Sequence, residues 1–142
     1  MKLTSVMAEV HVFDGVVNGS PGRFLLGFDN GRVLGFRAAG DGFRMDRDIE
    51  PFVDLDVGEC GRFEVANMTQ SLDQRLSNAE VKDVFWLKLE SAQIGVQLRL
   101  ADDDTFQFWV DGDELWWGDA KALDEHWREY GDTPKPADPV QI

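Results

Sequence analysis

Most side chains of this sequence that could do chemistry are carboxylates, with 27 Asp and Glu residues among 142. Asp54 and Asp56 are two residues apart in a predicted strand, so they share a face, as a general acid–base pair would need. Two further acidic runs, at residues 102–104 and 111–114, have the composition of calcium loops but lack the spacing D-x-[DN]-x-[DN]-G with its downstream Glu. Because neighbouring acids are common on solvated strands, these spacings predict no catalytic residue and no metal site.

The other candidates for catalysis are His11, His126 and Cys60. A nucleophilic cysteine needs a base close in space, and the sequence G-E-C-G around Cys60 matches no nucleophile signature. Each histidine stands alone in a predicted strand or helix, where a structural or solvated role is more common. The chain contains no phosphate-binding loop, no G-x-S-x-G and no H-E-x-x-H. We therefore expect a non-enzymatic protein without a cofactor, and the single cysteine excludes an internal disulfide.

The charge of the chain is strongly negative and concentrated near its C-terminal end. The formal net charge is −13, and residues 101–142 hold 12 acidic residues against 3 basic ones. Nucleic acids and anionic membranes both attract basic surfaces, so direct binding to either is disfavoured. An acidic surface instead attracts a basic protein partner. No apolar run reaches 18 residues and no signal peptide is recognisable, so we expect no membrane span and a cytoplasmic location.

The elements that must position these residues are mainly strands. Residues 6–13 alternate with period two, which predicts a strand with one buried face. Asn30-Gly31 lies between two apolar runs and predicts a two-residue hairpin turn that pairs Phe28 with Val33. Further elements are expected as a half-exposed strand at 51–57, a short strand at 62–66, and a short helix or structured loop at 68–79.

Residues 84–117 show the clearest pattern, in which alternating apolar segments are joined by short connections. The pattern predicts a four-stranded antiparallel meander, with a two-residue turn at Asp111-Gly112 that pairs Trp109 with Glu114. The inner face is expected to carry Phe85, Leu87, Leu89, Ile94, Val96, Leu98, Leu100, Phe106, Phe108, Val110, Leu115 and Trp117.

A C-terminal helix is expected at residues 120–130. Asp119 is a good N-cap, and Gly131 is a good residue for the end of the helix. Residues 132–142 contain three prolines and are expected to form a flexible tail. Residues 1–131 are therefore predicted to form a single β-rich α+β domain. Its architecture is a mainly antiparallel, twisted sheet or partly closed barrel, with the C-terminal helix packed on it.

Three tryptophans are expected on the outer face of the meander: Trp86, Trp109 and Trp116. Large aromatic patches are rarely left in solvent. Either the C-terminal helix folds back over them, or they form a binding surface, or they are buried in a homodimer. In the second case the neighbouring acids would select a basic partner.

These observations favour a non-catalytic, acidic protein-interaction domain, although a merely solubilising acidic surface is the simpler interpretation of the charge. A stoichiometric inhibitor, such as an immunity protein or antitoxin that covers the basic site of a toxin or nuclease, would have this composition. The expected binding residues are Trp86, Asp102, Asp103, Asp104, Trp109, Asp111, Asp113, Glu114 and Trp116.

Two alternatives stay open at the level of sequence. The aromatic residues could line a β-barrel-like cavity for an apolar ligand. Aspartates at positions 54, 56, 111 and 113 could serve a carboxylate-based enzyme if two of them converge in a cleft.

Overall fold

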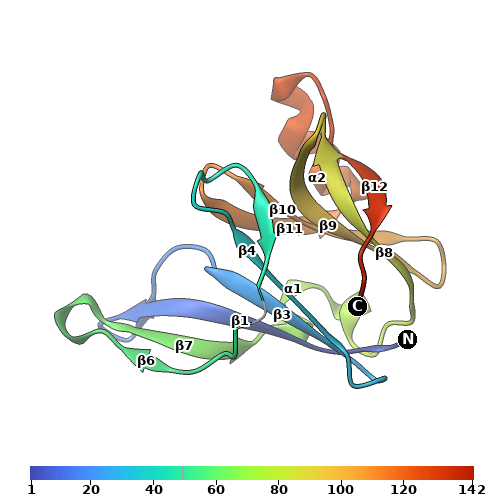
Figure 1. Cartoon of the computed structure of the whole chain (residues 1–142). Helices are drawn as coiled ribbons and strands as arrows, with labels where there is room; N and C mark the ends of the chain where they lie inside the picture. The colour runs from blue at the N-terminus through green and yellow to red at the C-terminus, as the bar shows by residue number, and fades with distance from the viewer. Residues whose placement is uncertain (49) are drawn as a thin grey trace.

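The structure, a computed structural model, describes residues 1–48 and 50–142. Two antiparallel sheets pack against each other, and one helix covers the far side of the smaller sheet (Figure 1). From edge to edge, the larger sheet contains β5 (Met45–Arg47), β4 (Val33–Ala38), β3 (Arg23–Phe28), β1 (Leu3–Phe13), β7 (Arg62–Asn67) and β6 (Leu55–Asp56), with β2 (Val16–Val17) paired to β1. The smaller sheet contains β11 (Glu114–Asp119), β10 (Thr105–Asp111), β9 (Ala92–Leu100), β8 (Val81–Leu89) and β12 (Lys135–Pro139). The helices are α1 (Thr69–Leu72) and α2 (Ala120–Trp127).

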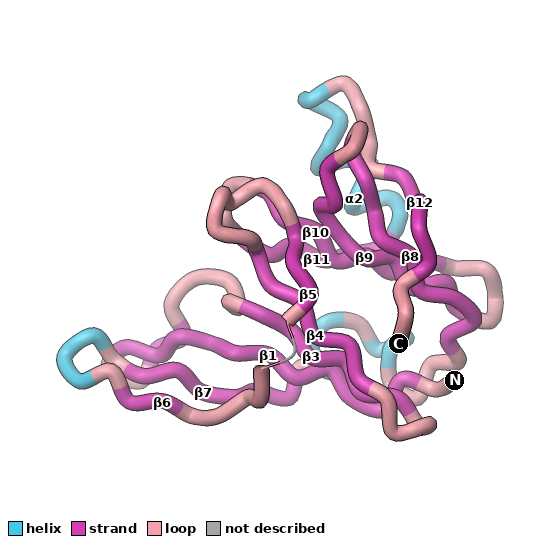
Figure 2. The backbone as a smooth tube through the Cα atoms, in the orientation of Figure 1, coloured by secondary structure: helices cyan, strands magenta, loops and turns pink. Residues whose placement is uncertain are grey.

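The two sheets are twisted and stay open, each with two edge strands (Figure 2). The prediction of a mainly antiparallel, β-rich architecture with a C-terminal helix is confirmed. Of the two arrangements weighed from the sequence, the open sheet is the correct one and the partly closed barrel is not.

The main core lies between the two sheets. The predicted period-two strand lies within β1, whose buried side chains are Leu3, Val6, Ala8, Val10 and Val12. At the centre, the rings of Phe24 and Phe36 each lie 5.0 Å from the ring of Phe108 on the opposite sheet. These aromatic contacts fill the centre of the space between the sheets.

A second, smaller core lies on the outer face of the smaller sheet. Leu123 and Trp127 on α2 pack there against Leu87, Ile94 and Trp109. The helix begins as predicted, since the Asp119 carboxylate accepts a hydrogen bond of 2.9 Å from the Ala122 N–H. The predicted packing of the C-terminal helix on the sheet is confirmed.

The side chains of strand β8 point to the opposite faces of the sheet from those predicted. Val84 belongs to the core between the sheets and Trp86 packs against it, whereas Leu87 packs under α2. A bulge between Leu87 and Lys88 also turns Ile94 toward the helix. Both faces of β8 are covered by protein, so both carry apolar residues, and alternation alone cannot identify the inner face. The predicted inward orientation of Phe85, Leu87, Leu89 and Ile94 was therefore wrong.

The hairpin between β3 and β4 lies at the predicted place but in a different register. Gly27 pairs with Val33 and Leu26 with Leu34, one residue away from the predicted pairing of Phe28 with Val33. Phe28 instead accepts from Gly31 N–H and donates to Arg32 O, and Gly31 has φ +79°. This is a three-residue loop ending in a left-handed glycine, which the same Asn-Gly pair also allows.

The remaining segments partly match the expectations. Only Leu55–Asp56 of the predicted strand at 51–57 pairs in a sheet, and residues 68–79 form α1 followed by a 3-10 turn at Gln74–Leu76. Within the segment expected to be a flexible tail, β12 pairs with β8, and the Val140 N–H donates to Val84 O at 2.9 Å. Prolines are tolerated there because β12 is an edge strand.

Candidate functional site

The strongest concentration of interacting polar and aromatic side chains lies where the β10–β11 hairpin meets the end of α2. We call Asp111, Trp116, His126 and Tyr130 the hairpin cluster. The hairpin turn consists of Gly112 and Asp113, which both have positive φ (+63° and +67°), as a two-residue turn of this kind requires. Asp111 therefore pairs with Glu114, and Trp109 with Trp116.

The sequence-based pairing of Trp109 with Glu114 was consequently wrong by two residues. The error arose because Asp111-Gly112 was taken as the turn, whereas the chain turns one residue later. A shift of two residues keeps every side chain on its predicted face, so Val110, Leu115 and Trp117 still face inward or pack on the inner core.

Asp111 is the hydrogen-bonding centre of the hairpin cluster. Its Oδ2 accepts from His126 Nε2 at 2.8 Å and from the Tyr130 hydroxyl at 3.0 Å. Its backbone carbonyl accepts from Trp116 Nε1 at 3.1 Å. An ionised carboxylate only accepts hydrogen bonds, so the proton on His126 lies on Nε2. One aspartate thus holds three side chains from the strand, the helix and the turn that follows it.

The aromatic rings of this region pass from buried to exposed. The His126 ring lies 5.3 Å from Trp109 and 4.8 Å from Trp116, and Trp127 lies 5.0 Å from Tyr130. Trp109 is 2% exposed, whereas Trp116 is 40% and Tyr130 60% exposed. The helix therefore covers one of the two paired tryptophans and leaves the other at the surface.

Tyr130 provides a spectroscopic test of this geometry because it is the only tyrosine in the chain. Its hydrogen bond to the Asp111 carboxylate, and the charge of that carboxylate, raise the pKa of the Tyr130 phenol above its ordinary value. A raised pKa means that this contact stabilises the fold at pH values below the ordinary pKa of about 10 and is lost as the pH rises through the folded-state pKa.

We expect absorbance titration near 295 nm to give a Tyr130 pKa above that of a free tyrosine. Asp111→Asn should return the pKa toward about 10, whereas Asp113→Asn, two residues away, should leave it in place. Tryptophan fluorescence recorded in the same samples reports whether the fold persists. An unshifted pKa in the folded wild-type protein would show that Tyr130 does not bond Asp111 in solution.

The structure separates the other residues that the sequence grouped into one binding surface. Trp86 is partly buried and packs against the core between the sheets, and Trp109 is buried beneath α2, so the two lie on opposite faces of the smaller sheet. The face proposed for a homodimer is therefore occupied by α2, and of the three tryptophans only Trp116 is exposed on it.

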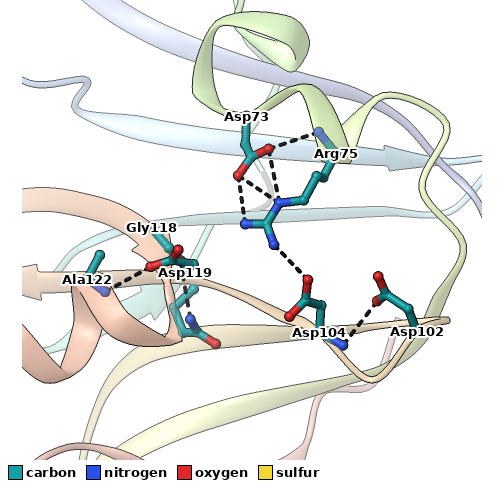
Figure 3. A network of polar contacts seen from close by, with 8 residues as sticks. Asp73, Arg75, Asp102, Asp104, Gly118, Asp119 and Ala122 are labelled. Atoms are coloured by element: carbon teal, nitrogen blue, oxygen red, sulfur yellow. Dashed lines mark hydrogen bonds and ion pairs between the residues drawn. The ribbon is translucent and has the colours of Figure 1, made fainter.

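The two acidic runs lie at opposite ends of β10. Residues 102–104 form the β9–β10 turn and residues 111–114 the β10–β11 turn, and β10 has 7 residues, a separation on the order of 20 Å. In the first run, Asp104 accepts from Arg75 at 2.8 Å, and Asp102 accepts from the Asp104 N–H (Figure 3). Asp103 accepts from Lys82 at 3.2 Å. Asp103 and Asp104 are therefore partly neutralised by basic side chains of the protein, whereas Asp102 bonds a backbone N–H of its own turn. In the hairpin run, Asp111 contacts the exposed aromatic residues.

Of the remaining catalytic candidates, His11 and Cys60 lie next to each other, whereas Asp54 and Asp56 lie away from Asp111. Asp54, just before β6, accepts from the Val65 N–H, and Asp56 in β6 accepts from the Gly58 N–H. Asp111 lies on the other sheet. Cys60 is exposed in a 3-10 turn, where its carbonyl lies 2.6 Å from His11 Nε2. Among residues 1–48 and 50–142, no group of three His, Cys, Asp or Glu side chains is arranged to hold a metal ion.

A second polar cluster was missed by the sequence analysis. Glu9, Arg23 and Arg37 lie directly opposite one another on β1, β3 and β4, on the face turned away from the core. Arg23 and Asp48 are both buried (8% exposed), with Arg23 Nη1 3.2 Å from Asp48 Oδ2. These residues lie far apart in the sequence, so no local spacing could have indicated the cluster.

No helix within the described part of the chain is both long and apolar enough to cross a membrane. The chain matches no model of a protein family, no curated protein and no solved structure.

Proposed function

We propose that this protein is a non-catalytic, acidic interaction domain that binds a basic protein partner through the hairpin cluster and the acids beside it. The observation that carries the proposal is the exposure of Trp116 and Tyr130 around a carboxylate, on the most acidic part of the chain. Tryptophan and tyrosine are among the residues that contribute most to binding in protein interfaces.

The chemistry of the cluster suits a cationic partner. Asp113 and Glu114 are exposed beside the two aromatic rings, and the chain carries −13 overall. The negative field would speed the approach of a basic partner, and the aromatic rings would supply apolar contact and cation–π attraction after docking. Because Asp111 bonds Trp116, His126 and Tyr130, these side chains are held in place before binding, which lowers the entropic cost of association.

The finer proposal is that the protein acts as a stoichiometric inhibitor of immunity or antitoxin type. An acidic surface that occludes the basic active site of a toxin or nuclease would need no catalytic residue of its own. The partner's positive charge, rather than its fold, is the property that this surface selects.

The proposal is tested by affinity capture with the purified protein as bait, first on lysate of the native host and then on purified basic candidates such as nucleases. We expect one basic protein to be retained at low salt. The double variant Trp116→Ala/Tyr130→Ala should lose it. Phe13→Ala removes an aromatic side chain of similar exposure (47%) on the larger sheet and serves as the matched control.

Salt separates the two contributions to binding. Retention that falls steeply between low and high salt assigns the affinity to charge, and retention that persists assigns it to the aromatic contact. A partner that binds the Trp116→Ala/Tyr130→Ala variant as well as the wild type would contradict the proposal.

A further inference from the structure

The hairpin turn that carries the cluster also forms one wall of a polar hollow. The Asp113 N–H donates to Gly42 O at 2.8 Å, which holds the turn against the loop after β4. On that side Asp113 lines an open hollow of about 360 Å³ together with Glu9, Arg23, Arg37, Asp48 and Glu50. The hollow therefore adjoins the surface to which we assign binding.

The charge of the hollow favours a cationic ligand. Four carboxylates line it, against the two guanidinium groups of Arg23 and Arg37. Arg23 is committed to the protein, because it donates to Glu9 and to the carbonyls of Glu50 and Pro51 and lies 4.2 Å over the Phe52 ring. An anion entering the hollow would meet a net negative charge and a guanidinium whose donors are already used.

One carboxylate oxygen of Asp48 is ion-paired with Arg23 but accepts no hydrogen bond from the described residues. Its side chain is 7% exposed, and its Oδ1 accepts from the Glu50 N–H at 2.9 Å. Its Oδ2 is fully buried and accepts no hydrogen bond from any described residue, although two cationic nitrogens lie nearby. Buried carboxylate oxygens without a hydrogen bond are uncommon in folded proteins and call for a physical explanation.

Arg37 covers this oxygen only loosely. Its Nη1 lies 3.9 Å from Asp48 Oδ2, too far for a hydrogen bond, and its side chain is 53% exposed. Movement of this side chain into solvent would open Asp48 to the hollow at little cost. The Arg37 guanidinium therefore lies beside Asp48 Oδ2 without a hydrogen bond that would hold it there.

We propose that the hollow receives an arginine side chain of the basic partner, which displaces Arg37 and donates to Asp48 Oδ2. Glu50 and Asp113 line the hollow and offer further carboxylate oxygens. A planar guanidinium suits this arrangement better than an ammonium group, because it presents several donors in a fixed fork. The inference rests on the proposed function and adds the side chain that the partner must supply.

The test is a titration of the ¹⁵N-labelled protein with N-acetyl-arginine amide at low ionic strength, followed by NMR. We expect saturable shifts at the amides of Gly22, Ala38 and Asp113, which line the hollow. The citrulline analogue, which has the same shape without the charge, should give none, and the lysine analogue should bind more weakly. Non-saturating shifts spread over the acidic surface, or equal binding of the lysine analogue, would overturn the assignment of an arginine pocket.

Variants identify the acceptor. Arg37→Gln removes the resident cation and should tighten binding several-fold, whereas Asp48→Asn should weaken it about tenfold, as expected for loss of a charge-assisted hydrogen bond. If Asp48→Asn fails to fold, Asp113→Asn, at the exposed wall of the hollow, is the second test and should weaken arginine binding by a smaller factor. Unchanged binding in Arg37→Gln together with unchanged binding in the carboxylate variant would overturn the proposal.

The two proposals can fail separately. Suppose a captured partner depends on Trp116 and Tyr130 but is retained equally by Arg37→Gln and Asp113→Asn. This result would contradict the arginine pocket and support the interaction surface. Saturable arginine binding without any basic protein partner would support the arginine pocket and contradict the proposed function.

Discussion

Trp109→Ala is expected to lower the free energy of unfolding by about 3–5 kcal/mol, the usual cost of removing a buried aromatic side chain. Trp109 is 2% exposed and packs against Leu123 and Trp127 of α2. The variant would leave a cavity between the sheet and the helix. Trp116→Ala, at the position directly opposite on β11, should cost less, because its side chain is 40% exposed and its removal leaves no enclosed cavity.

Urea unfolding of the two variants measures this difference directly, since the midpoint shifts at nearly constant slope. Trp109→Phe should recover part of the loss, because it keeps an aromatic ring under the helix. Similar losses in both alanine variants would mean that α2 does not cover Trp109 in solution. The pair also serves the binding experiments, because Trp116 can be removed to test binding while the fold persists.

Arg23→Met is expected to destabilise the protein by about 3–5 kcal/mol, the cost of leaving buried charge without its partner. Arg23 is ion-paired with Glu9 and Asp48, and its donors also satisfy two backbone carbonyls. Methionine keeps much of the apolar stem, so the loss reports mainly the guanidinium. Arg37→Met, at an exposed position 3.9 Å from the same Asp48, should cost less than about 1 kcal/mol.

A double-mutant cycle separates charge from packing in the Arg23 variant. In Arg23→Met/Asp48→Asn the buried negative charge is also removed, so the two losses should be non-additive by about 1–3 kcal/mol. Thermal or urea unfolding at neutral pH supplies the four values. Additive losses would show that Asp48 is not the electrostatic partner of Arg23, and that Arg23 stabilises the fold through Glu9 and the two backbone carbonyls.

Together these variants distinguish residues that stabilise the fold from residues that are exposed for binding. Trp109 and Arg23 hold the helix and the outer face of the larger sheet in place. Trp116, Tyr130 and Arg37 are exposed on the same two regions. Losses of stability are therefore expected at the first pair, and changes in binding without loss of the fold at the second group.

Several features of the fold could be predicted from the sequence because they depend on residues close together in the chain. The alternation of Val6, Ala8, Val10 and Val12 predicted β1, and the capping geometry of Asp119 predicted the start of α2. Turn positions were predicted near Asn30-Gly31 and Asp111-Gly112, since glycine and asparagine adopt positive φ at low cost. The strand registers of these two hairpins were not predicted correctly, because each pair of turn residues is compatible with more than one loop length.

The candidate site shows the same division. The sequence placed Asp111, Asp113, Glu114 and Trp116 in the acidic C-terminal part of the chain, beside a helix that carries His126. It could not show that Trp109 and Trp86 are covered from opposite sides, because β8 and β10 carry apolar residues on both faces. It also could not show that residues 102–104 and 111–114 lie at opposite ends of β10 with different ion pairs.

The amino-acid sequence by itself therefore determined the strand-rich composition, the C-terminal helix with its cap, and the negative charge of the last third of the chain. Each of these follows from side-chain chemistry within a few residues. Only the tertiary structure decided which tryptophan is exposed and which carboxylates meet Arg23. Those outcomes depend on contacts between segments as distant as Glu9, Arg23, Asp48 and Asp113, whose meeting is set by how two sheets and a helix pack together rather than by any local pattern.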